Sequence, residues 1–282
     1  MAVSTTTSMN GLFNTIYEDA LFVAREANIM TNLVRTFSAR GWMNRTIGIY
    51  PTLSAESVGE NVDYSNATEF TKTALATLTP GEVITQVILT DRRIDTDLDN
   101  ARVDAAQEMG NAIATKIDTD LGSTFDSFTT DKGDGAGNSA TIANFAAAVS
   151  VLRNNKAPMP IYAVVHPYHW HDIWIELGQP AANQALLGDV ANQALRDFFV
   201  GRWVNIQWFV NANIAVDGSD DAVSGVFNPQ GIGFDVRKAP VLEPERDASL
   251  RAWELNMSAG YGYGVIRDSF GVGFTADATE PT

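Results

Sequence analysis

The sequence predicts an α+β protein of elongated shape, and two long segments carry that prediction. Between residues 98 and 128, apolar and small side chains recur at steps of three and four, which is the spacing of one helix face. A helix of about 30 residues would be about 45 Å long. From Trp253 to Val265, apolar residues alternate with polar or small ones, which is typical of a long strand with one buried face. A helix and a strand of similar length indicate a slab rather than a sphere.

The first 90 residues predict an arm, a loop and a strand. Residues 10–40 contain two runs of helical spacing, which predict two short amphipathic helices whose apolar stripes must be buried against something else. Residues 48–82 are rich in Ser, Thr, Asn and Gly and predict a long two-stranded excursion. Because an isolated hairpin is barely stable in water, we expect this excursion to lie on a neighbouring subunit. Residues 83–89, VITQVIL, predict a short strand.

The second half of the chain predicts helices and strands in mixed order. Residues 142–152 show a second helix face, and residues 161–165, IYAVV, predict a buried strand. Pro167 begins a third helix, since proline is favoured at the first helical position. The apolar face of that helix consists of Trp170, Ile173, Trp174 and Leu177. Residues 181–216 predict an Ala-rich helix and an aromatic strand, and residues 216–225 predict an acidic turn.

The composition argues against several functional classes. The chain has 19 Lys and Arg against 34 Asp and Glu, a net charge of −15, which argues against a broad nucleic-acid-binding surface. The absence of cysteine excludes disulfides, thiolate metal sites and a cysteine nucleophile. No run approaches the ~18 apolar residues of a membrane span. The N-terminus lacks the pattern of a signal peptide. We therefore expect a protein made in the cytoplasm and not associated with a membrane.

All three histidines lie in the segment HPYHWHD, residues 166–172. On a helix, His169 and His171 are about 200° apart, so they cannot share one metal without help from elsewhere. His169, Asp172 and Glu176 fall on one face, opposite the tryptophans. That face is a candidate for a weak divalent-cation site or a metal-dependent hydrolase. A solvated polar face is the favoured interpretation, because the zincin spacing H-E-x-x-H is absent.

No other segment carries a catalytic or cofactor motif. DTDLDN, residues 95–100, begins like a calcium loop, but Asn100 replaces the required glycine and Ala106 the required glutamate. GYGYG, residues 260–264, lacks the third glycine of the dinucleotide fingerprint. There is no P-loop and no nucleophile elbow, and nothing selects a carboxylate pair for glycoside hydrolysis. We therefore assign no catalytic, cofactor-binding or metal-ligating residue, and we expect no cofactor and no enzyme activity.

Three segments, taken in order, carry a resemblance to a known family. They are TLTPGEVITQVILTDRRIDTDLDN, YAVVHPYHWHDIWIELG, and the stretch from FNPQGIGF to FGVGF, which contains EPERD at 243–247. In this order they resemble the major capsid protein of tailed double-stranded DNA bacteriophages, which has the Hong Kong 97-type capsid fold. EPERD is similar to the acidic–basic–acidic turn before the long final strand of that family. The resemblance implies an N-arm, an extended E-loop, a P-domain with a long spine helix, an A-domain and returning P-domain strands, at residues 1–45, 46–85, 86–138, 139–235 and 236–282.

The resemblance also implies a function and a set of partners. A member would be a structural head protein that self-assembles into an icosahedral shell of hexamers and pentamers around packaged phage dsDNA. Its partners would be other copies of itself, a portal, a scaffolding protein and a decoration or cement protein. It would enclose dsDNA without sequence-specific binding, and it would lie in the virion capsid after assembly in the host cytoplasm. Lys72 is the only lysine of the E-loop, and we do not expect the crosslink that some relatives form. The alternative is an encapsulin-like compartment that encloses a cargo enzyme.

Overall fold

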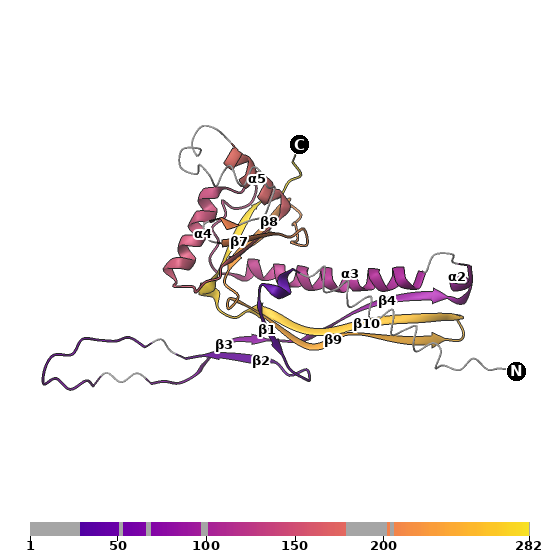
Figure 1. The fold of residues 1–282 in the computed structure, drawn as a ribbon, viewed down its shortest axis with the longest axis horizontal. Coiled ribbons are helices and arrows are strands. Elements are labelled where there is room, and N and C mark those ends of the chain that lie inside the picture. The colour runs from indigo at the N-terminus through magenta and orange to yellow at the C-terminus, as the bar shows by residue number, and fades with distance from the viewer. Residues whose placement is uncertain are drawn as a thin grey trace.

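The computed structural model describes residues 29–50, 53–65, 69–96, 101–178, 202–203 and 206–281. The molecule is elongated, with a layered region at one end of a long helix and a hairpin that extends beyond the end of a sheet (Figure 1). Within the described residues, no helix is long and apolar enough to cross a membrane.

A four-stranded sheet and one long helix form the elongated half of the molecule. The strand order is β1 (Arg35–Ser38), β9 (Ile232–Asp247), β10 (Ala252–Val265) and β4 (Gly81–Thr90). β10 pairs antiparallel with both of its neighbours, and β1 pairs parallel with β9. The helix α3 (Ala101–Gly122) lies along this sheet, followed by a 3-10 turn η2 (Ser123–Ser127) (Figure 1). One core cluster joins the helix to the sheet: Met109, Ile113, Leu121, Leu255, Met257 and Tyr261.

A five-stranded sheet with two helices forms the layered half. The strand order is β11 (Gly271–Asp277), β8 (Asp221–Phe227), β5 (Tyr162–Val165), β7 (Ile206–Val210) and β6 (Arg202–Trp203). The helices are α4 (Ile142–Asn154) and α5 (Pro167–Gly178). They share a second core cluster with the sheet: Phe145, Leu152, Ile173, Trp208, Val272 and Phe274.

A two-stranded hairpin projects from the elongated half. It consists of β2 (Arg45–Ile49) and β3 (Thr73–Leu78), and no described residue between the two strands belongs to a helix or strand. Smaller elements complete the chain: the 3-10 turns η1 (Met30–Asn32) and η3 (Asp268–Phe270), and the short helix α2 (Asp91–Thr96).

Most of the outer edge of β9 has no neighbouring strand among the described residues. Among the described residues, β1 pairs with β9 only from Gly233 to Val236, so β9 from 239 to 247 is paired by β10 on one side alone. Pro240 and Pro244 lie in this stretch. Proline lacks an N–H, so strands tolerate it where the nitrogen faces away from a ladder. This edge therefore cannot offer a continuous row of donors to another strand.

The structure confirms the long strand, the second helix and the helix that begins at Pro167. The long helix is present but shorter than predicted, because α3 ends at Gly122 and a 3-10 turn follows. Four predictions were wrong in whole or in part. The acidic turn predicted at 216–225 is confined to its first residues, because 221–227 form β8. The second helix of the arm is replaced by η1 and β1, because residues 35–38 pair with β9. EPERD is not a turn: it ends β9, and the chain reverses at 248–251. The last segment does not return wholly to the elongated half, because β11 pairs with β8. The first arm helix and the Ala-rich helix at 181–200 lie outside the described residues.

Candidate assembly surface

The histidine segment is the first candidate site, and the structure places His169 in the interior. Its side chain is 0% exposed. Nε2 lies 3.0 Å from the carbonyl oxygen of Ala276, and Nδ1 lies 2.7 Å from the hydroxyl of Ser224. Because a carbonyl only accepts, Nε2 carries the proton and Nδ1 accepts from the hydroxyl. The Ser224 oxygen in turn accepts from the backbone N–H of His166. The predicted solvated face was therefore wrong at His169.

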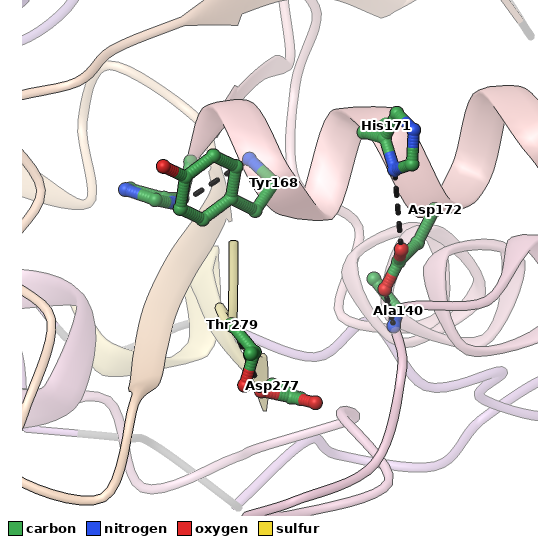
Figure 2. Close-up of polar contacts among 7 residues, drawn as sticks. Ala140, Tyr168, His171, Asp172, Asp277 and Thr279 are labelled. Atoms are coloured by element: carbon green, nitrogen blue, oxygen red, sulfur yellow. Dashed lines mark hydrogen bonds and ion pairs between the residues drawn. The ribbon is translucent and has the colours of Figure 1, made fainter. Parts of the chain in front are cut away.

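The two acids grouped with His169 have separate structural partners. Asp172 accepts a hydrogen bond from the backbone N–H of Ala140 at 3.3 Å, and its other carboxylate oxygen lies 3.6 Å from Nδ1 of His171 (Figure 2). Glu176 accepts from the N–H of Ile142 at 2.7 Å, at the first residue of α4. An acid at this position also satisfies the positive end of the helix dipole. The three residues thus tie α5 to its neighbours and do not converge on one point.

The electrostatics of this segment fit a buried structural role. Burial, aided by the neighbouring His169, lowers the pKa of His166 from 6.5 to about 4. Burial also lowers the pKa of His169, against the opposing effects of the Ala276 carbonyl and of Asp172, Asp277 and Asp221. Both imidazoles are therefore neutral at neutral pH. Within the described ranges, no three His, Cys, Asp or Glu side chains are arranged to hold a metal ion.

A different surface stands out on the hairpin, where large apolar side chains face solvent. Six of them lie in the connecting loop: Tyr50, Leu53, Val58, Val62, Tyr64 and Phe70. The rings of Tyr50 and Phe70 stack with centroids 4.6 Å apart and planes 3° apart, although Phe70 is 59% exposed. Solvent-exposed apolar residues grouped in this way mark an interaction surface. The sequence analysis missed these exposed apolar residues because the loop is rich in Ser, Thr and Asn.

A second apolar surface lies on the four-stranded sheet, on the face away from α3. Val83, Val87 and Leu89 of β4 pack against the core that α3 shares. The alternate residues Ile84 and Ile88 point the other way, and Ile84 is 64% exposed. The segment VITQVIL is apolar on both faces, and this pattern could have predicted an apolar surface on the outer face of β4.

The turn between β1 and β2 extends this second surface. Trp42 covers Gly260 of β10, where an added Cβ would meet the Trp42 ring at 2.6 Å. Half of Trp42 and most of the adjacent Met43 remain exposed. We call Trp42, Met43, Ile84 and Ile88 the outer sheet patch.

Comparison with known proteins identifies the family of this chain. Residues 84–273 match the family model described as phage capsid protein. The chain belongs to the phage capsid protein family. No curated protein sequence matches it.

Solved structures show that this capsid protein has the Hong Kong 97-type fold. A structure from Mycobacterium phage Che8 has a TM-score of 0.67 at 16% identity, covering 88% of this chain and 90% of that one. The capsid of Ralstonia phage GP4 gives 0.66 at 12%, covering 89% and 88%. A virus-like particle from Pyrococcus furiosus gives 0.61 at 9%, covering 93% and 99%. The protein is thus a structural capsid protein, and the phage capsid model does not favour the encapsulin-like alternative.

Proposed function

We propose that this capsid protein is the major head subunit, which assembles into an icosahedral shell of hexamers and pentamers around packaged phage dsDNA. One observation carries the proposal. The hairpin exposes stacked aromatic rings and four further large apolar side chains, and the described part of the chain buries none of them. Such a loop gains stability only when a neighbouring subunit covers it.

Each region of the structure is assigned to one domain of the capsid fold. The hairpin β2–β3 corresponds to the E-loop, and the four-stranded sheet with α3 to the P-domain. The five-stranded sheet with α4 and α5 corresponds to the A-domain, and it includes β11. The outer sheet patch is the surface that the E-loop of a neighbour would cover, because both surfaces are apolar and exposed. Residues 1–45 would form the N-arm.

The charge of the chain agrees with an enclosing role. A net charge of −15 disfavours tight adhesion between the shell wall and packaged DNA. We further propose that the subunit acts without catalysis, in the virion capsid, after assembly in the host cytoplasm. A portal and a scaffolding protein would be further partners in the head, and shell closure would not require them.

Electron microscopy of the purified chain, with sedimentation velocity, tests the proposal. We expect closed shells from the wild-type chain. A Tyr50→Ser and Phe70→Ser double variant should stay folded, because both rings are exposed, and should lose shell formation. Met159→Ser removes an exposed apolar side chain from the layered half and should leave assembly intact. A wild-type chain that stays a monodisperse monomer under all assembly conditions would refute the proposal.

A further inference from the structure

The hairpin meets the rest of the subunit mainly at its base, and β3 provides the first anchor there. Leu78, the last residue of β3, is buried, and its methyl groups lie against Gly233 and Gly264. An added Cβ at Gly233 would sit 3.0 Å from one methyl group, and one at Gly264 would sit 3.3 Å from the other. Only Thr79 and Pro80 separate Leu78 from the first residue of β4. An apolar contact at one point holds the hairpin in place but does not by itself fix its direction.

Arg45, the first residue of β2, provides the second anchor. Its Nε lies 2.9 Å from a carboxylate oxygen of Asp235 on β9. Its Nη2 donates to the carbonyl oxygen of Ser38 at 3.3 Å, and its guanidinium lies 5.0 Å from the ring centroid of Phe37. One side chain thus links the hairpin to both β9 and β1.

Asp235 is the centre of this cluster. Its side chain is 0% exposed, and Arg237 of the same strand reaches it at 2.6 Å. Arg237 also donates to the carbonyl oxygen of Gly41, in the turn between β1 and β2. The two ion pairs are short, but their angles fall short of hydrogen-bond geometry. The carboxylate is therefore held chiefly by charge, and a buried charge requires such partners.

We infer that Asp235 is a positioning residue that fixes the direction of the β2–β3 hairpin through Arg45. It thereby sets where the apolar loop of one subunit meets the next. The inference rests on the proposed function for its consequence in assembly, but the anchor itself is a property of the single subunit. Arg237 allows the direction of the hairpin to be tested without unfolding the sheet. When Arg45 is removed, Asp235 keeps one buried cation and the sheet keeps its pairing.

Distance measurement between two spin labels tests the anchor in the unassembled chain. The chain has no cysteine, so Thr77→Cys on β3 and Thr115→Cys on α3 give two unique and exposed attachment points. Labels on the Tyr50→Ser and Phe70→Ser background, in which assembly is blocked and Arg45 is intact, should give a narrow distance distribution. Arg45→Met should broaden or shift it, and Arg45→Lys should have an intermediate effect, since lysine keeps the charge but not the fork of donors.

The matched control is Arg246→Met, which removes an exposed bidentate ion pair with Asp91 at the far end of β9. It should leave the distribution unchanged. Thermal melting checks that each variant is folded. Asp235→Asn provides a second variant. It removes the negative charge that attracts Arg45, so it should broaden the distance distribution as Arg45→Met does.

Assembly is then compared at equal protein concentration. Arg45→Met should lose most closed shells while the control assembles normally. An unchanged distance distribution in folded Arg45→Met would overturn the inference whether or not shells form. A broadened distribution with full shell yield would overturn the link to assembly. Failure of the wild-type chain to form shells would count against the proposed function and leave the label measurement valid.

Discussion

Acidification should destabilise the unassembled subunit before its carboxylates are protonated, and His166 is the main cause. The ring of His166 lies at the N-terminus of α5, where Nδ1 accepts from the N–H of Tyr168 at 3.4 Å. The pKa of His166 is lowered from 6.5 to about 4 by burial. Between these values the unfolded chain binds a proton at this site and the folded chain does not. The contribution of His166 to the free energy of unfolding is therefore fully present above about pH 6.5. It is lost as the pH falls toward 4.

The magnitude follows from the size of the shift. Each unit of pKa difference corresponds to about 1.4 kcal/mol, so a change from 6.5 to about 4 sets an upper bound of about 3–4 kcal/mol. The lowered pKa of His169 acts in the same direction. Asp118 acts in the opposite direction: burial raises its pKa, so its effect is to increase stability as the pH falls. A comparison of matched histidine variants removes this opposing contribution.

Urea unfolding at pH 7.5, 6, 5 and 4.5, with assembly blocked by the Tyr50→Ser and Phe70→Ser double variant, measures the effect. His166→Asn is the informative substitution, because asparagine is also a favoured N-cap residue and can accept from Tyr168 without titrating. It should flatten the loss of stability below pH 6.5. His171→Asn, whose side chain is partly exposed, should retain the slope. An equally steep slope in His166→Asn and the parent would refute the reasoning.

Three further predictions concern the layered half, each measured by urea unfolding at pH 7.5. Gly133→Ala should cost about 2 kcal/mol or more, because an added Cβ would collide with the backbone carbonyl of Thr275, which cannot rotate away. Phe145→Ala should cost about 3–5 kcal/mol, because this fully buried ring is removed from the second core cluster. Glu176→Ala should cost about 1–3 kcal/mol, because the N–H of Ile142 loses its charged acceptor.

Matched variants sharpen these three comparisons. Gly81→Ala has open space around the added methyl and should change stability little, so an equal loss at both glycines would contradict the steric argument. Phe145→Leu keeps most of the apolar volume and should cost clearly less than alanine. Glu176→Gln keeps a side-chain oxygen and should recover part of the loss; a variant as unstable as Glu176→Ala would show that the charge alone matters.

The long elements of this fold were predictable because their patterns persist over many residues. The alternation from Trp253 to Val265 cannot be fitted by a helix, and it became β10. Pro167 marked the start of α5 for a local reason, the missing N–H. Local rules of this kind act within one element, so one sequence is enough to apply them.

The failures have a common physical cause, which is that the deciding contact lies far away in the chain. Met30, Leu33, Val34 and Phe37 have helical spacing, but Phe37 is in a strand because residues 35–38 pair with β9 nearly 200 residues later. The helical wheel placed His169 opposite the tryptophans and so in solvent. The wheel contains no information that β8 and β11 cover that side as well. The anchor at Asp235 likewise joins residues that no spacing rule connects.

The prolines on the open edge of β9 have a consequence for a protein that must accumulate in many copies before it is used. A long bare strand edge invites any extended chain to add to it, and repeated addition gives fibres. Pro240 and Pro244 interrupt the donors on this edge, and the exposed Glu243 and Glu245 beside them repel a like-charged copy. Open-ended polymerisation along β9 is therefore disfavoured, so that crowded subunits remain available for contacts that close on themselves.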